Sequence, residues 1–227
     1  MTRWIAGALA LLAIAGLIAL GVWQLERRTW KLALIAQVER RLAAAPISAP
    51  RPAEWQRIGR DDAYTRVKVR GVFAEGRETL VQAATALGAG YWVLTPLVTD
   101  RGFTVLVNRG FVPPEGKIRR QRLSGEVTIT GLLRVSEPGG GFLRHNDPVA
   151  DRWYSRDVAA ISAKRGLNST APYFIDADAA SEPGSPRGGL TVIAFANNHL
   201  QYALTWFVMA AMLAAASLWI AFGRGRP

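Results

Sequence analysis

The sequence predicts two transmembrane α-helices, one near each end, flanking one β-rich α+β domain of mainly antiparallel strands. Two observations predict the helices: Trp4–Trp23 and Tyr202–Phe222 carry no charged residue, and each is long enough to cross a bilayer. A third predicts the domain, because all 17 acidic residues lie between Glu26 and Glu182, among short β-like runs separated by turn residues.

The first span is expected at residues 4–23, after a tail of residues 1–3. At about 1.5 Å per residue this length matches the ~30 Å hydrocarbon core. A cleaved signal peptide is the alternative, because Arg3 gives a basic start and Ala13-Ile14-Ala15 resembles a cleavage site. The apolar run continues to Val22, beyond that site, and therefore favours a retained anchor.

The second span is expected at residues 199–222, with His199 at the end next to the domain and residues 223–227 as a second tail. Trp206 and Trp219 lie towards the two ends of its apolar run, as interfacial anchors do.

The domain, residues 24–198, is expected to begin with an amphipathic helix over residues 24–45, which Pro46, Pro50 and Pro52 then end. Five β-like runs follow: Tyr64–Phe73, Glu78–Gln82, Tyr91–Thr99, Phe103–Asn108 and Val127–Arg134. In the first and fourth runs the alternation predicts that the valines face inward, and in the first that the basic residues face out. These are Val67, Val69, Val105 and Val107 against Arg66, Lys68 and Arg70.

Turns and a short helix connect the remaining parts of the domain. Asp100-Arg101-Gly102 predicts a hairpin turn, and Ser155–Lys164 predicts a helix capped by Ser155 or Asp157 and ended near Gly166. Ser181–Gly189 is predicted to be a loop and Leu190–Ala196 a last strand.

Charge and composition exclude several classes of protein. The chain has a net charge of +11, but the basic residues are scattered and accompany no binding module, so nucleic acid is not an expected partner. The many arginines reflect either anionic partners, such as lipid headgroups, or codon composition. The absence of cysteine excludes disulfides, thiolate metal sites and cysteine nucleophiles.

Hydrolytic, phosphate-binding and divalent-metal sites find little support. His145 lies in Arg144–Pro148, where Asn and Asp side chains are expected to bond backbone amides in a turn. Pro138–Gly141 lacks the setting of a phosphate loop and is expected to be flexible. The pairs Asp61-Asp62 and Asp176/Asp178 lack further ligands, so solvated loops explain them.

His199 is different, because it places an imidazole at the membrane interface. On a helix, His199, Tyr202, Trp206, Met209 and Leu213 form one stripe that could pack against the first span. An imidazole above an aromatic ledge suits a planar, amphipathic ligand. An ordinary aromatic belt with a hydrogen-bonded histidine is the alternative.

Five blocks of sequence together resemble the Surfeit locus family of cytochrome c oxidase assembly factors. They are Leu20–Lys31, Arg66–Phe73, Gly90–Leu97, Val105–Pro113 and Asn198–Phe207. Phe111 departs from the Trp expected in many relatives, and both are large aromatics.

The resemblance implies a non-enzymatic inner-membrane protein with cytoplasmic termini and an extracytoplasmic domain. It also implies transient binding of haem a, with His199 as the ligand of the haem iron, during maturation of the oxidase large subunit. We place Tyr202, Trp206, Trp23, Gln24, Arg27 and Arg28 in the same site, the two arginines as partners of the propionates. Expected partners are the oxidase large subunit, haem a synthase and membrane lipid.

Two points stay open in the sequence. A haem-free scaffold that stabilises the immature oxidase subunit through the outer domain is the alternative function. Asn108-Arg109-Gly110, at the end of a predicted strand, either contacts a partner or forms a tight turn with a paired arginine. The topology rests on the resemblance, because the basic residues near the spans do not favour it.

Overall fold

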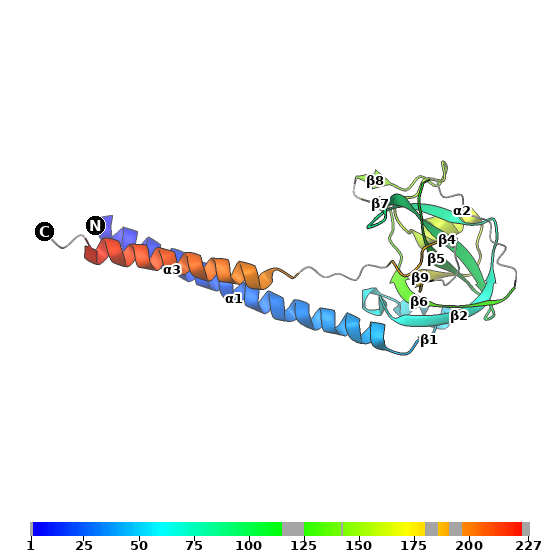
Figure 1. Ribbon diagram of the computed structural model, residues 1–227, viewed down its shortest axis with the longest axis horizontal. Coiled ribbons are helices and arrows are strands. Elements are labelled where there is room, and N and C mark those ends of the chain that lie inside the picture. The colour runs from blue at the N-terminus through cyan, green and yellow to red at the C-terminus, as the bar shows by residue number, and fades with distance from the viewer. Residues whose placement is uncertain (1, 115–124, 142, 180–185, 191–196, 224–227) are drawn as a thin grey trace. The chain divides into compact units, whose positions relative to one another are not determined.

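The predicted fold class is confirmed: two apolar helices flank a β-rich domain in the computed structural model (Figure 1). The structure describes residues 2–114, 125–141, 143–179, 186–190 and 197–223. The chain divides into two compact units. The first consists of residues 1–37 and 193–227 and holds the two apolar helices; the second consists of residues 38–192 and holds the β-rich domain.

Helix α1 (Thr2–Ala43) is continuous from the apolar segment into the amphipathic one. No Gly or Pro interrupts residues 24–43, so nothing in this stretch breaks the hydrogen-bond ladder. The helix ends three residues before Pro46, with Arg40 and Arg41 in its last turn, where cations suit the helix dipole. Helix α3 (His199–Gly223) is the second apolar helix, and both are long enough to cross a membrane.

The domain is built from strands and two short 3-10 helices. In chain order these are β1 (Ile47–Ser48), η1 (Pro52–Arg57), η2 (Arg60–Asp62), β2 (Arg66–Phe73), β3 (Thr79–Thr85), β4 (Gly88–Thr99), β5 (Thr104–Val112), β6 (Val127–Val135), β7 (Gly140–Gly141), β8 (Arg144–His145), α2 (Val158–Arg165) and β9 (Thr170–Ala177). The sheet order β1-β2-β6-β9-β5-β4-β3 closes on itself, because β2 also pairs with β4 through Gly71–Phe73. The result is a barrel-like sheet (Figure 1).

The strand alternation predicted for the barrel is confirmed. Val67, Val69, Val105 and Val107 are buried in the interior, while Lys68 and Arg70 are exposed. Arg66 lies partly buried on the outer face and pairs with Asp178 at 2.5 Å. Successive side chains of a strand point to opposite faces of the sheet, so every second residue enters the core.

A second core lies between the outside of the barrel and α2. Leu94, Leu106 and Phe174 face it from the sheet, while Val158 and Ile161 face it from the helix. Asp157 caps α2 by accepting from the Ala160 N–H, and Gly166 ends it at φ +60°, as the sequence predicts. The turn Asp100–Gly102 is also confirmed, with Gly102 at φ +79°.

The structure differs from the sequence predictions at two places in the domain and leaves a third untested. Strand β9 lies where no strand is predicted; its exposed Pro172 falls where the register with β5 shifts, and its pairing with β6 begins at the next residue, Tyr173. Part of the expected flexible loop forms the small ladder β7–β8. The predicted last strand lies outside the described residues except for Leu190, which is not in a strand.

Candidate functional site

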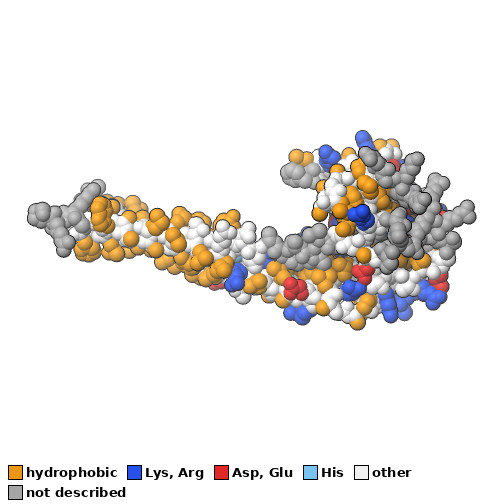
Figure 2. Space-filling model, in the orientation of Figure 1, with side chains coloured by type: hydrophobic (Ala, Val, Ile, Leu, Met, Phe, Trp, Pro, Cys, Tyr) orange, Lys and Arg blue, Asp and Glu red, His pale blue; other side chains and the backbone are white. Residues whose placement is uncertain are grey.

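Helices α1 and α3 pack against each other along a seam, which we call the α1–α3 seam. Figure 2 shows hydrophobic side chains along most of the visible helical surface. The least exposed positions recur at alternating spacings of three and four residues, the pattern of two helices meeting along a narrow line. On α1 they are Ala10, Ile14, Leu17, Gly21, Gln24 and Arg28; on α3 they are His199, Ala203, Trp206, Phe207, Ala210, Leu213, Ala214 and Ser217.

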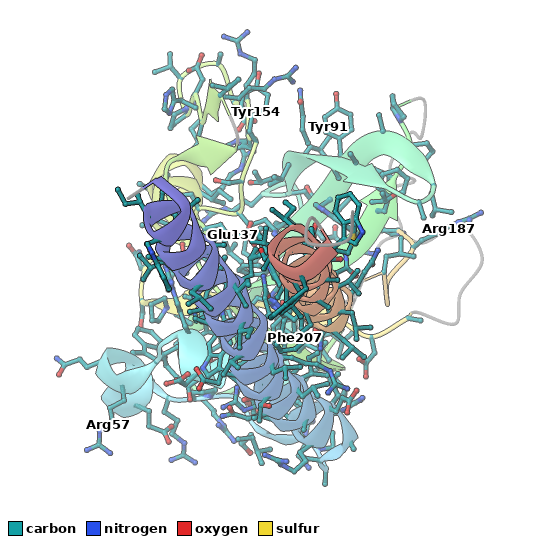
Figure 3. The ribbon with its side chains drawn as sticks, turned by 90° about the vertical axis from the view of Figure 1, so that its left-hand side faces the viewer. Arg57, Tyr91, Glu137, Tyr154, Arg187 and Phe207 are labelled. Carbon is teal, nitrogen blue, oxygen red and sulfur yellow. The ribbon has the colours of Figure 1, made fainter. Side chains whose placement is uncertain are left out.

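Gly21 permits the closest approach in the seam. A Cβ on Gly21 would lie 2.4 Å from Cε1 of Phe207, which Figure 3 labels on α3. Ala203 and Ala210, seven residues apart, are almost fully buried on the facing helix. Small residues let helix backbones approach in lipid, where apolar burial alone gives no driving force between helices.

His199 meets Gln24 in this seam. The Nδ1 atom of His199 lies 2.8 Å from Oε1 of Gln24, across 175 residues of sequence. Gln24 stands one helical turn beyond Gly21, so the same face of α1 that receives Phe207 also presents the amide. His199 is the first residue of α3 and is partly buried. The imidazole is therefore held by its own helix, α3, and by a hydrogen-bond partner on α1.

The other predicted site residues divide between the seam and its surroundings. Arg28 and Trp206 are partly buried at seam positions. Tyr202 is 55% exposed on the flank of the seam. Trp23 is 53% exposed and lies about 200° around α1 from Gly21.

Arg27 lies close to Trp23 on the wheel of α1, with its guanidinium stacked over the ring of Trp30 at 4.1 Å. The structure thus brings His199 and Gln24 together and places Trp23 and Arg27 on the face of α1 that turns away from α3.

The stripe expected from the sequence is correct at His199, Trp206 and Leu213 and displaced by one position at its other two members. Tyr202 and Met209 are exposed, whereas the buried line runs through Ala203 and Ala210. Large apolar residues face lipid as readily as protein, so the small residues mark the helix contact. Gly21, Ala203 and Phe207 are the seam residues that sequence reasoning missed, and the seven-residue spacing of the alanines is the signal that could have found them.

An open groove on α3 lies on the opposite face of the helix from His199. Leu200, Leu204 and Val208 form its apolar wall, and Gln201 and Thr205 its polar wall. These residues centre about 180° from His199 around the helix. The groove therefore belongs to a different surface from the His199–Gln24 pair.

A second polar cluster lies in the barrel, around Asp176. Its side chain is 3% exposed and accepts from Asn108 at 2.7 Å, from Arg134 at 2.8 Å and from Arg156 at 3.3 Å. Arg156 also binds Glu137 at 2.5 Å. The expectation of a solvated loop is wrong for Asp176, which is buried in β9, whereas Asp178 follows the strand with a partly exposed side chain that pairs with Arg66.

The turn around His145 follows the prediction. Asn146 Oδ1 accepts from the N–H groups of Tyr154 and Ser155, and Asp147 accepts from the Ala150 N–H at 3.0 Å. His145 itself is exposed on β8. Among the described residues, no three His, Cys, Asp or Glu side chains could together hold a metal ion.

Arg109 departs from the expected paired arginine. The tight turn is absent, because Asn108-Arg109-Gly110 lies inside β5, where the register with β4 shifts and the Gly110 N–H donates to Asn108 Oδ1 at 3.1 Å. The Arg109 guanidinium lies over the Phe73 ring at 5.4 Å, and it makes no ion pair or hydrogen bond with a residue that the structure describes. Burial lowers the pKa of Arg109, and Glu78 only partly offsets this.

Residues 11–211 match the profile of the SURF1 family, a range that includes the whole barrel and both Gln24 and His199. The chain belongs to the SURF1 family. Surfeit locus protein 1 of Rattus norvegicus is 39% identical over 223 residues, covering 88% of this chain and 70% of the relative. The Homo sapiens protein of that name is 38% identical, with 92% and 74% covered. The SURF1-like protein of Monosiga brevicollis is 35% identical, with 88% and 81% covered.

Membership confirms the resemblance seen in the sequence. The family is known as cytochrome c oxidase assembly factors, and it is a family of assembly proteins and not of enzymes. Together with the two helices that are long and apolar enough to cross a membrane, it indicates a membrane protein.

Proposed function

We propose that this protein binds haem a through His199 at the membrane interface and assists its insertion into the large subunit of cytochrome c oxidase. The His199–Gln24 pair carries the proposal, because it orients an imidazole at the start of a membrane helix. Nε2 of His199 makes no hydrogen bond with a described residue, and a neutral imidazole nitrogen is a normal axial ligand of haem iron.

The surroundings of His199 suit the rest of a haem. The macrocycle and its tail are apolar, and Tyr202 and Trp206 offer an aromatic ledge on the flank of the seam. The propionates are anionic, and Arg28 lies about one turn past Gln24 on the same face of α1. Haem a is the cargo here, so the chain's task is to hold it and release it.

The proposal includes a topology and partners. Both short tails lie in the cytoplasm and residues 24–198 lie outside, which brings the haem to the outer side of the inner membrane. Haem a synthase is the proposed donor, the oxidase large subunit the acceptor, and membrane lipid the surrounding contact. Reporter fusions at each terminus test the topology: activity of an export-dependent reporter at either end would overturn it.

The central test is the pigment content of the full-length protein purified from cells that make haem a. His199→Ala removes the ligating nitrogen and keeps helix propensity, so haem is lost while the protein remains inserted and folded. His145→Ala is the matched control, because His145 is exposed on β8, in the barrel unit. Wild-type haem content in the His199 variant would overturn axial ligation. A haem-free wild type that still binds the oxidase subunit would favour the scaffold.

The two arginines provide a graded second test. Arg28→Ala removes a cation of the seam, whereas Arg27→Ala removes one stacked on Trp30. We expect Arg28→Ala to weaken haem affinity by up to about fivefold and Arg27→Ala to weaken it less. Equal losses, measured by haem titration, would contradict a propionate contact in the seam.

A further inference from the structure

We propose that Gln24 is a positioning residue that selects the iron-binding nitrogen of His199 and sets how readily haem is released. This inference rests on the proposed function and deepens it. It begins from one contact, the 2.8 Å approach of Nδ1 of His199 to Oε1 of Gln24.

The chemistry of the two groups fixes the tautomer. An amide oxygen only accepts hydrogen bonds, so Nδ1 of His199 carries the proton and donates it to Gln24. In a neutral imidazole the other nitrogen then has the lone pair. Gln24 thereby leaves Nε2 of His199 as the nitrogen available to iron and holds the ring in one rotation.

The position of Gln24 makes this orientation depend on the helix pair. The amide comes from α1 and the imidazole from α3, and Gly21, one turn before Gln24, allows the close approach of Phe207. A histidine on an isolated α3 would rotate about its side-chain bonds. The ligand is therefore oriented only where the α1–α3 seam is formed.

The neutrality of Gln24 determines how strongly the ring binds. A carboxylate that accepts from the distal ring nitrogen increases the basicity of a histidine ligand and strengthens its bond to a metal. An amide accepts the same hydrogen bond without a negative charge. Glutamine thus keeps the ring aligned and the ligand moderate in strength, which suits a protein that must pass its cargo on.

Three variants of the full-length, haem-loaded protein in detergent separate these effects. Gln24→Leu removes the acceptor at similar size, and Gln24→Glu keeps an acceptor and adds charge. Gln201→Leu is the matched control, because Gln201 is an exposed glutamine on the opposite face of α3. The measurements are the rate of haem transfer to excess apomyoglobin, the visible spectrum and the midpoint reduction potential.

We expect Gln24→Leu to lose haem 10–100 times faster than wild type, the usual effect of removing a partner of a histidine ligand. Gln24→Glu should lose haem more slowly than wild type and have a lower midpoint potential, since a more basic ring favours ferric iron. Gln201→Leu should match wild type. Thermal unfolding without haem should be similar for all four proteins.

Other results would overturn the inference in distinguishable ways. Unchanged haem loss in Gln24→Leu, with haem still lost in His199→Ala, removes Gln24 from the site and leaves the proposed function standing. An unchanged potential and release rate in Gln24→Glu would show that the residue does not tune the ligand. A wild-type protein that binds no haem would overturn the proposed function together with this inference.

Discussion

Two polar clusters described above, around Asp176 in the barrel and at His199 in the α1–α3 seam, differ in how many of their polar atoms form hydrogen bonds. Asp176 is 3% exposed and receives three side chains, two of them charged. His199 is only partly buried, and among the described residues its ring is hydrogen-bonded only to Gln24, through Nδ1. A cluster with every group paired stabilises the fold, whereas a cluster with an unused donor atom can bind a ligand.

Electrostatics reinforce this difference. Burial by itself would lower the pKa of Arg156, but Glu137 and Asp176 outweigh burial and raise it. The barrel thus holds its charges in fixed pairs, and any charge removed leaves its partner desolvated. In the seam the partner of His199 is the uncharged amide of Gln24, so removal of Gln24 breaks no buried ion pair.

The largest expected effect comes from Asp176→Ala, which removes the buried one of the two carboxylates that Arg134 and Arg156 share, the other being Glu137. We expect the free energy of unfolding to fall by about 3–5 kcal/mol. Denaturant unfolding of the full chain in detergent, followed by tryptophan fluorescence, measures it. Glu126→Ala, in the exposed pair with Arg70, should cost at most about 1 kcal/mol. Equal costs for the two would erase the contrast between buried and exposed pairs.

Gly21→Leu tests whether the seam depends on close approach. Because even a Cβ would lie 2.4 Å from the Phe207 ring, we expect about 1–3 kcal/mol of destabilisation and loss of bound haem. Thermal unfolding and pigment content measure the two effects. Gly16→Leu is the matched control, since a Cβ there meets nothing within 4 Å. Identical behaviour of the two variants would mean that the helices do not pack through Gly21.

Arg109→Met tests whether an arginine of the barrel that has no described ion pair contributes less to stability than a paired one. The desolvated guanidinium makes no ion pair with a described residue, so its loss should change the free energy of unfolding by no more than about 1 kcal/mol. Arg134→Met, which breaks a bond to buried Asp176, should cost at least about 2 kcal/mol. If Arg109→Met proves the more costly of the two, ion pairing in the barrel does not decide stability.

The smallest effect concerns an exposed carboxylate, Asp147. Its pKa is held below the ordinary value, first by the Ala150 N–H and then by Arg152. A lowered folded-state pKa stabilises the protein above the unfolded-state value of about 4, and this contribution disappears as pH falls through the folded-state value. The melting temperature of Asp147→Asn should therefore lie slightly below that of wild type near neutral pH. The difference between the two melting temperatures should disappear in acid. A difference that grows in acid would contradict a lowered pKa of Asp147.

The alternation of apolar and polar residues predicts which side chains of a strand face the core. Val67 and Val69 alternate with Lys68 and Arg70, so their faces follow from the period of a strand. Strand β9 was not predicted, since proline is accepted in a strand at a register shift, and the shift at Pro172 is seen only in the assembled sheet.

Long-range partners account for most of what sequence reasoning missed. Arg134 lies 42 residues from Asp176, and Gln24 lies 175 residues from His199. Asp176 therefore resembles a solvated loop residue until the strands beside it are known. His199 could be singled out because its place beside an apolar span is visible locally, while its hydrogen-bond partner was not.

The place of β9 in the sheet has a consequence for the order in which the protein is made. β9 pairs with β6 on one side and β5 on the other, so the barrel cannot close before residue 177 has been synthesised. At roughly 5–20 residues per second, the ribosome leaves the edges of β5 and β6 unpaired for several seconds. His199 follows later still, so the chain can offer its imidazole to a pigment only after the barrel has everything it needs to close. Under the proposed function, translation itself thus delays haem loading until the barrel is complete.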